Sequence, residues 1–404
     1  MSLSIPPAVA DLPPLYLKRG EERRLAAGHL WVFSNEIDAA RSPLVGFAPG
    51  DPVRILTDRE RLVGYGYVNP HSLIAARILG RDPVHAPGKS LLVHRMQVAL
   101  SLRRRLYDRP FYRLVHGESD GLPGLVVDRY GDTLVAQIGT AGMERLKDQI
   151  AAALTKVIKP TALVWKNDAG TRVLEGLPSY VETAFGDAPE TVILEENGVA
   201  FEVPLAGGQK TGWFYDQAAN RAAFLKYVPG ARVLDVFSYQ GAWGLQALKA
   251  GAAEVTCVDA SEPALQSLAR TAALNSLAVT TERGDAFDVL ERLHGEKHRF
   301  DVVVVDPPAF VKRKKDLPKG EAAYRRLNLL AMQLLDRDAL LVSCSCSYHL
   351  APEQLTAAIQ RAGRHLGRFV QIVETGGQAP DHPIHPAIPE TKYLKAFFCR
   401  VVVD

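Results

Sequence analysis

The sequence predicts an α/β protein whose C-terminal half forms a mostly parallel, doubly wound sheet. Two observations predict this fold. From residue 191 onward, short apolar runs alternate with helical stretches. The preceding residues instead hold short β-rich runs separated by turn signals such as Asn69-Pro70. Because 404 residues exceed one ordinary domain, we expect three domains: a small β-rich domain over 1–85, a central α+β domain over 86–190, and the doubly wound domain over 191–404.

The elements of the first two domains follow from their hydrophobic periodicity. A helix is expected over Glu21–Ala27, where Gly28 would end it, and a basic helix over Leu91–Tyr107. A hairpin is expected within Leu114–Val135, followed by a helix over Met143–Val157. The strands expected in the third domain are Arg232–Val236, Glu254–Asp259, Thr280–Gly284, Phe300–Asp306, Ala339–Ser343, Phe369–Glu374 and Ala396–Val403.

The composition is that of a globular chain, with 47% hydrophobic and 23% charged residues. No run approaches the roughly 18 apolar residues of a membrane span, and the N-terminus lacks the layout of a signal peptide. We therefore expect a cytoplasmic protein with no membrane partner. The four cysteines form no C-x-x-C pair, so neither a zinc or other metal site nor a disulfide framework is expected.

Basic residues are concentrated near the N-terminus. Residues 1–110 contain 16 Lys and Arg against 10 Asp and Glu, whereas the whole chain has a net charge of only +3. This surplus suits binding of a polyanion such as RNA. A solvated surface explains the same charge equally well.

Four successive strand ends of the third domain carry residues suited to a nucleoside cofactor. The first strand enters a glycine turn, which lets the backbone approach a ligand closely. Asp259, at the end of the second strand, is placed to hold a ribose diol, and Asp285 after the third is placed to accept from an adenine amino group. Acids at strand ends also form turns and helix caps, but four in register favour S-adenosylmethionine. Nicotinamide is the alternative, weakened by the missing G-x-G-x-x-G. The expected cofactor contacts are Asp235, Phe237, Ser238, Gly241, Asp259, Asp285, Ala286, Asp306 and Pro307.

Two thiols follow the fifth apolar run, in Ser343-Cys344-Ser345-Cys346-Ser347. A thiolate that adds to C6 of cytosine turns the ring into an enamine-like nucleophile, which allows a methyl group to be accepted at C5. Strand alternation puts both thiols on one face, but Cys346 lies nearer the strand end and the expected crevice. We therefore predict Cys346 as the nucleophile and Cys344, like Cys257, as a core residue.

The segment Asp306-Pro307-Pro308-Ala309-Phe310 follows the fourth strand. Asp306 is expected to be catalytic, bonding to the N3/N4 edge of cytosine. Adenine N6-methyltransferases usually have an aromatic residue at the place of Ala309. The loop beyond is basic and would contact RNA phosphates, although a solvated loop is the alternative. The substrate contacts expected here are Pro308, Phe310, Lys312 and Arg313.

With these residues, the chain resembles the RlmI/RlmO group of 23S ribosomal RNA cytosine-5 methyltransferases along nearly its whole length. The segments that carry the resemblance are Lys18–Ile37, Gly117–Tyr130, Lys210–Arg221 and the Ser-Cys-Ser at Cys346. The resemblance implies an N-terminal PUA domain, a β-barrel that binds RNA, and a Rossmann-like class I methyltransferase domain at the C-terminus. It adds Gln217 and Arg221 as cofactor contacts, and Asp216, Lys18 and Arg19 as substrate contacts.

The same resemblance implies a homodimer that methylates a cytidine in 23S rRNA, free or in a large-subunit assembly intermediate. Two other functions stay open. One is a methyltransferase acting on adenine or on a small molecule, against which the basic N-terminal third and Ala309 weigh. The other is a non-catalytic assembly factor that binds RNA and the cofactor, against which the presence of Cys346 and Asp306 weighs.

Overall fold

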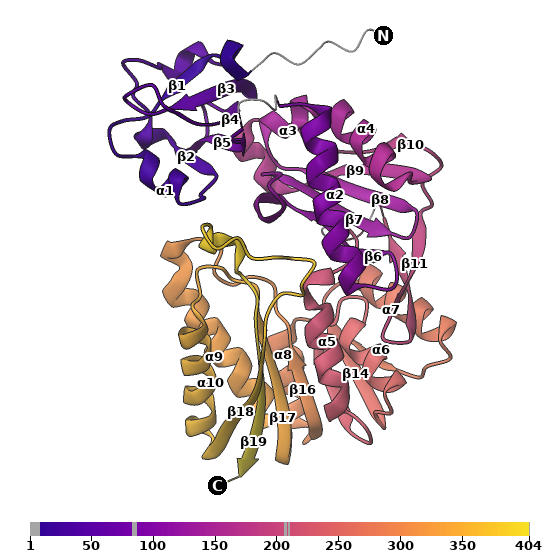
Figure 1. The fold of residues 1–404 in the computed structure, drawn as a ribbon. Coiled ribbons are helices and arrows are strands. Elements are labelled where there is room, and N and C mark those ends of the chain that lie inside the picture. Colours follow the sequence, from indigo (N-terminus) through magenta and orange to yellow (C-terminus); the bar gives the residue numbers. More distant parts are fainter. Residues whose placement is uncertain (1–8, 83–86, 206–207, 209–210, 404) are drawn as a thin grey trace. The chain divides into compact units, whose positions relative to one another are not determined.

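The computed structural model describes residues 9–82, 87–205, 208 and 211–403 (Figure 1). The chain forms two compact units. The first comprises Met1–Val192, Pro204–Trp213 and Asp381–Thr391, and the second comprises Ile193–Val203, Phe214–Pro380 and Lys392–Asp404. The predicted boundary after residue 85 and Lys210 of the matched segment lie outside the described residues.

The first unit begins with a five-stranded sheet in the order β1-β3-β4-β5-β2. β1 is parallel to β3, and the other neighbours are antiparallel. The sheet and α1 bury a core that includes Leu25, Val32, Val53, Ile55 and Ile78. The predicted helix before Gly28 is therefore present. The bounds are β1 Pro14–Tyr16, α1 Glu22–Ala26, β2 Trp31–Phe33, β3 Asp51–Leu56, β4 Leu62–Val68 and β5 Ile74–Gly80.

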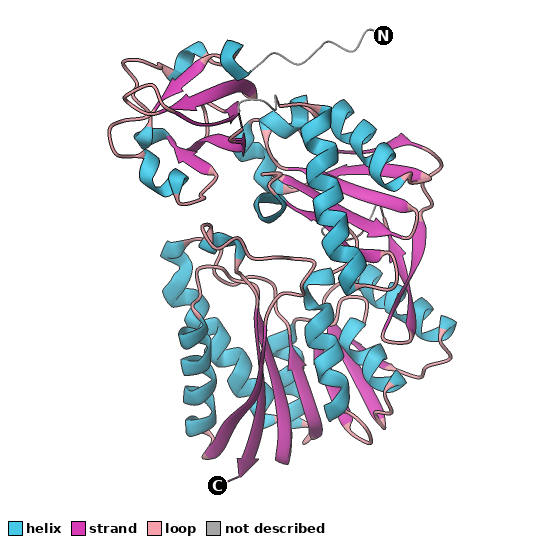
Figure 2. Ribbon diagram, in the orientation of Figure 1, coloured by secondary structure: helices cyan, strands magenta, loops and turns pink. Residues whose placement is uncertain are grey.

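The rest of the first unit is a second five-stranded sheet, in the order β10-β9-β8-β7-β6. Apolar residues of α2 and α4 share one core with its strands, which is the expected α+β arrangement (Figure 2). The predicted helix over Met143–Val157 is two helices, α3 and α4. The bounds are α2 Lys89–Leu106, β6 Phe111–His116, β7 Leu125–Tyr130, β8 Thr133–Ile138, α3 Ala141–Arg145, α4 Lys147–Ile158, β9 Ala162–Asn167 and β10 Tyr180–Phe185.

The second unit contains the hairpin β11-β12 and a seven-stranded sheet in the order β15-β14-β13-β16-β17-β19-β18. β13 to β17 run parallel, and β19 is antiparallel to both of its neighbours. The chain order reverses between β13 and β16, so their carboxyl ends flank the switch point where such sheets bind ligands. The bounds are β11 Thr191–Glu196, β12 Val199–Pro204, β13 Arg232–Val236, β14 Glu254–Asp259, β15 Thr280–Arg283, β16 Phe300–Val305, β17 Leu335–Ser345, β18 Arg368–Gly376 and β19 Lys395–Val403.

Helices cover the seven-stranded sheet. One core joins α8, α9 and α10 to strand residues such as Leu234, Val303 and Leu341. α6 packs closely on β13 and β14, because a Cβ at Gly244 would lie 2.5 Å from Cys257 Sγ. Among the described residues, no helix combines the length and apolar character needed to cross a membrane. The bounds are α5 Ala218–Phe224, α6 Ala242–Lys249, α7 Glu262–Leu274, α8 Ala286–Gly295, α9 Leu317–Gln333 and α10 Pro352–His365.

Candidate active site

The turn between β13 and α6 has an unusual backbone. Phe237 and Tyr239 have φ values of +64° and +50°, and Gly241 has +76°. Non-glycine residues seldom adopt this left-handed region, and where they do the strain commonly marks a ligand site. The Ser238 N–H donates to the Val258 carbonyl at 3.0 Å, and the Gly241 N–H to the Ser238 carbonyl at 2.8 Å. The turn is thus held in a tight, strained conformation at the switch point.

Asp259 supports this turn from the end of β14. One carboxylate oxygen accepts from the Tyr239 N–H at 2.8 Å, and the other from the Ser261 N–H at 2.8 Å. Each oxygen has a second lone pair, so the carboxylate retains acceptor capacity for a hydroxyl pair. The buried Ser238 hydroxyl has no partner among the described residues. These groups at the carboxyl ends of β13 and β14 fit the ribose of a nucleoside cofactor.

Asp235 is fully buried below the turn. Its Oδ2 accepts from the Gly244 N–H at 3.0 Å, which ties β13 to the first turn of α6. Burial raises the pKa of this carboxyl to about 7. Asp235 thus shapes the predicted cofactor site from beneath it.

Asp285 is exposed at the start of α8. Its Oδ1 accepts from the Phe287 N–H at 2.9 Å, which makes it the N-cap of the helix. The neighbouring Ala286 is buried in the core shared by the helices and the sheet. Asp285 therefore caps α8 and is open to solvent, and its contact with adenine stays a prediction.

Asp306, at the end of β16, is held by two neutral donors. Gln217 Nε2 donates to Oδ1 at 2.9 Å, and Trp243 Nε1 donates to Oδ2 at 3.2 Å. Asn220 Nδ2 in turn donates to Gln217 Oε1 at 2.6 Å. Burial raises the pKa of Asp306 to about 6. The structure thus brings the predicted Gln217 and Asp306 together, and adds Trp243 and Asn220, which the sequence analysis missed.

The two ends of the Asp216–Arg221 segment, Asp216 and Arg221, bind other parts of the protein. The buried Arg221 guanidinium binds the carboxylate of Glu196 on β11 and the Phe214 carbonyl. Asp216 is buried, and its Oδ2 accepts from the Tyr393 hydroxyl at 2.7 Å. Their predicted contacts with cofactor and substrate stay predictions, whereas these bonds place Gln217 beside Asp306.

Cys346 follows β17 and faces the Asp306 segment, with its Sγ 3.9 Å from the Pro307 carbonyl oxygen. The serines on either side are buried and contact one phenol. Ser345 Oγ donates to Tyr324 Oη at 2.8 Å, and Tyr324 Oη lies 3.0 Å from Ser347 Oγ. The position of the thiol is therefore fixed from both sides.

The four cysteines differ sharply in exposure. Cys257, Cys344 and Cys399 are buried, whereas Cys346 is partly exposed. Burial also raises the pKa of the Cys344 thiol well above its usual value. Of the two thiols in the doubled motif, Cys346 is therefore the one suited to reaction.

The predicted substrate contacts are spread over both units. Pro308, Lys312 and Arg313 are exposed beside the Asp306 segment. Phe310 is half-buried, with its ring centroid 4.8 Å from that of Tyr324. Lys18 and Arg19 are exposed in the first unit, where Lys18 Nζ donates to the Asn35 carbonyl at 2.7 Å. Their predicted RNA contacts stay predictions.

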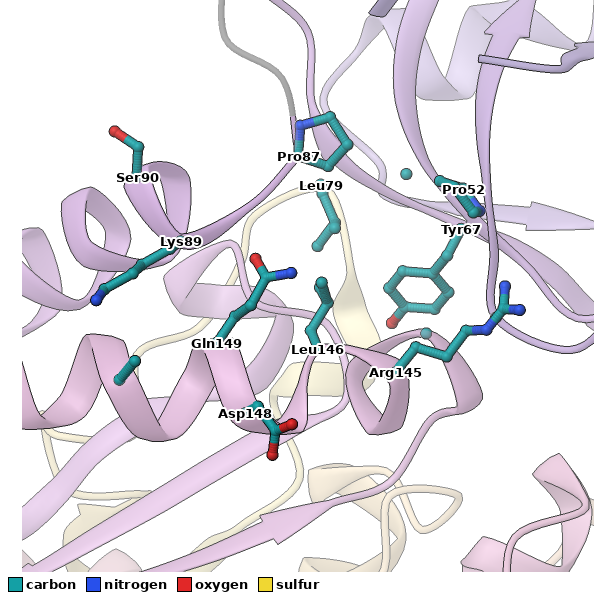
Figure 3. A pocket seen from close by; sticks show the side chains of 14 residues that line it. Pro52, Tyr67, Leu79, Pro87, Lys89, Ser90, Arg145, Leu146, Asp148 and Gln149 are labelled. Carbon is teal, nitrogen blue, oxygen red and sulfur yellow. The ribbon is translucent and has the colours of Figure 1, made fainter. Parts of the chain in front are cut away.

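A separate cavity of about 510 Å³ lies in the first unit. It is lined by residues of the first sheet, including Tyr67 and Leu79, and by helical residues such as Arg145 and Gln149 (Figure 3). The Tyr67 hydroxyl donates to the Pro123 carbonyl at 2.7 Å, which links the two sheets of this unit. None of the predicted site residues lines this cavity.

Comparisons with known proteins agree with the fold. A PUA-like domain family matches residues 15–81, and an S-adenosylmethionine-dependent methyltransferase family matches residues 150–398. Two solved structures share the fold over 96% of this chain and 100% of their own. One is a putative methyltransferase complexed with SAH, at a TM-score of 0.82 and 20% identity. The other is a putative SAM-dependent methyltransferase from Streptococcus mutans, at 0.81 and 19%.

The protein is thus an S-adenosylmethionine-dependent methyltransferase with an N-terminal PUA-like domain. Curated relatives named "Ribosomal RNA large subunit methyltransferase I" narrow the class. The protein from Photobacterium profundum is 37% identical over 396 residues, covering 96% of this chain and 99% of its own. The one from Vibrio cholerae is 36% identical over 402 residues, covering 96% and 100%. The chain therefore belongs to the family of the large-subunit ribosomal RNA methyltransferase I proteins.

Proposed function

We propose that this protein methylates C5 of a cytidine in large-subunit (23S) ribosomal RNA, with Cys346 as the covalent nucleophile. The names of its relatives support large-subunit rRNA as the substrate. The observation that carries the cytosine-C5 chemistry is the placement of Cys346. It is the one cysteine of four that is not buried, and it lies against the segment that follows Asp306.

The chemistry assigned to Cys346 is addition to the ring. Its thiolate forms a bond to C6 of cytosine, and the C5–C6 double bond becomes an electron-rich centre at C5. S-adenosylmethionine supplies an electrophilic methyl group at this point. Loss of the C5 proton then restores the double bond and expels the thiolate. The net change is one methyl gained and one proton released.

Asp306 is assigned to holding the cytosine edge. Its pKa of about 6 lets the carboxyl exchange a proton near neutral pH. The Gln217 and Trp243 donors fix its orientation, so the group is ordered before the base arrives. Lys312 and Arg313 on the exposed loop beyond are assigned to RNA phosphates, and Lys18 and Arg19 to RNA contacts of the PUA-like domain.

The assignment is tested by identifying the methylated nucleoside. Undermethylated ribosomal RNA and labelled S-adenosylmethionine are incubated with wild type, Cys346→Ala and Cys344→Ala, and the digested nucleosides are separated. We expect label in 5-methylcytidine with wild type and Cys344→Ala, and none with Cys346→Ala. Label in adenosine, or no label in RNA, would overturn the proposed function.

A further inference from the structure

A buried lysine lies beside Cys346. Lys395 begins β19 and is only 8% exposed, although lysines are seldom buried without a partner. In the antiparallel pairing of β17 with β19, Lys395 is opposite Ser345, the residue directly before Cys346. The lysine backbone is therefore fixed next to the nucleophile by the sheet itself.

The side chain of Lys395 reaches past Cys346 to the residues that follow it. Nζ donates to the Ser347 carbonyl at 2.5 Å and to the Leu350 carbonyl at 2.9 Å. Two of its three N–H donors thus bind the chain that follows Cys346, and its charge is held beside the residue next to the thiol. Burial lowers the pKa of Lys395 to about 8, and the charge of an ionised Cys346 opposes this shift.

Three other titratable groups described near this pair carry no positive charge. Tyr324 on α9 is buried, and burial raises its pKa, so its hydroxyl stays neutral near pH 7. Cys344 on β17 is buried, and burial raises its pKa well above the usual value, so its thiol is neutral near pH 7. Asp306, after β16, acts on Cys344 with a negative charge. Among these described groups, Lys395 supplies the positive charge.

We infer that Lys395 is a positioning residue whose buried ammonium group stabilises the thiolate of Cys346. The importance of this role for catalysis rests on the proposed function, whereas the effect of Lys395 on the thiol is expected in the free protein as well. Near pH 7 the lysine is protonated, so its positive charge favours the thiolate of Cys346 over the thiol, and the thiol proton passes to solvent when the thiolate forms. Thiolates are the reactive form of cysteine, so the lysine keeps Cys346 ready to add to the ring.

The test is the pH dependence of alkylation of Cys346 in the full chain. Iodoacetamide is applied between pH 6 and pH 10, and modification of Cys346 is quantified by peptide mass spectrometry. Lys395→Gln keeps an amide that can donate to the two carbonyls but removes the charge. We expect the midpoint of its profile to lie about one pH unit or more above that of wild type. Lys395→Arg keeps the charge, so its midpoint should lie close to that of wild type.

The matched control is Lys392→Gln, which removes an exposed charge three residues earlier and should leave the midpoint unchanged. A midpoint for Lys395→Gln equal to that of wild type overturns the inference. If Lys395→Gln does not fold, the reciprocal measurement decides. The titration of Lys395, followed by NMR of labelled lysine, should have a lower midpoint in Cys346→Ser than in wild type. Equal midpoints overturn the inference as well.

The two proposals fail in distinguishable ways. If the protein forms 5-methylcytidine through Cys346 but the alkylation profile does not respond to Lys395, only the role of the lysine is wrong. If the profile shifts but the methyl group is found elsewhere than on cytosine C5, only the proposed function is wrong.

Discussion

Three serines surround the two thiols, and the structure separates their roles. Ser347 Oγ accepts from the Val311 N–H at 3.1 Å and contacts the Tyr324 hydroxyl. The buried Ser343 hydroxyl has no partner among the described residues. The Ser-Cys-Ser around Cys346 is therefore the half of the doubled motif that is tied to the rest of the site.

This difference gives a matched pair of substitutions. Ser347→Ala leaves the buried Val311 N–H without its acceptor, which costs about 1–3 kcal/mol, and we expect methyl transfer to slow by roughly tenfold. Ser343→Ala removes an unpartnered hydroxyl and should leave both stability and rate almost unchanged. Thermal denaturation and single-turnover methylation of both variants provide the check. Equal losses of stability and rate in the two variants would contradict the separate roles of Ser347 and Ser343.

The sequence predicted Cys344 as a core residue, because strand alternation and distance from the strand end depend only on local order. The burial of Cys344 agrees with that prediction. The sequence did not predict Tyr324, Trp243 or Lys395 as neighbours of the site. They lie on α9, α6 and β19, and only the packing of these elements on the sheet brings them to Cys346 and Asp306.

At the scale of elements, the turn after β13 depends on Gly241. A Cβ there would lie 2.7 Å from Leu268 Cγ, and its φ is +76°. Gly230, before the same strand, has a similar φ of +74° but nothing within 4 Å of the added Cβ. Substituting each glycine by alanine therefore distinguishes the cost of backbone strain, which both share, from the cost of a steric clash, which only Gly241 has.

Gly230→Ala should cost about 1–2 kcal/mol, the penalty of the left-handed conformation alone. Gly241→Ala should cost more, since Leu268 must also move, and it should weaken binding of S-adenosylmethionine. Thermal denaturation and calorimetric titration of both variants measure these effects. A Gly241→Ala variant that binds the cofactor as tightly as Gly230→Ala would argue against the turn as the cofactor site.

The first and last residues of some elements could not be predicted from the sequence. β13 and β14 have their predicted bounds, because each is a short apolar run ending in a turn. β17 instead begins at Leu335, four residues before the predicted start. Leu335 pairs with Phe300 of β16, and a shift in register separates this pair from the next one, Leu340 with Val302. Similarly, α3 and α4 are separated at Leu146, whose ψ of 6° is not helical. Both features depend on neighbouring strands and helices.

At the scale of the whole molecule, the chain order does not follow the units. The segment Asp381–Thr391 lies between β18 and β19 but belongs to the first unit, whereas the sequence analysis assigned it to the third domain. Asp381 Oδ2 accepts from the Arg113 N–H at 2.8 Å, and its carbonyl accepts from Arg103 at 2.7 Å. Such distant pairings leave no periodic signal in the sequence.

We expect Asp381→Ala to loosen this attachment. The Arg113 amide loses its acceptor, so its hydrogen exchange should accelerate by roughly tenfold or more. Glu390→Ala, an exposed change in the same segment, should leave that exchange rate unchanged. Hydrogen exchange of the amides of β6, measured by mass spectrometry, compares the two variants. Unaltered protection in Asp381→Ala would show that the segment does not hold β6.

The alternation of strands and helices was sufficient to predict the doubly wound sheet, and the comparisons confirm a methyltransferase with a PUA-like domain. The place of the antiparallel β19 between β17 and β18 could not be read from this alternation. The homodimer and the cytoplasmic location stay predictions, since they depend on surfaces and surroundings outside a single chain.

The central claim is that Cys346 adds covalently to cytosine. RNA that contains 5-fluorocytidine has no C5 proton to lose, so the enzyme should stay attached to it after methyl transfer. With S-adenosylmethionine present, we expect wild type and Cys344→Ser to form an RNA adduct that survives denaturing electrophoresis, and Cys346→Ser to form none. An adduct formed by Cys346→Ser, or its absence in wild type that produces 5-methylcytidine, would contradict the claim.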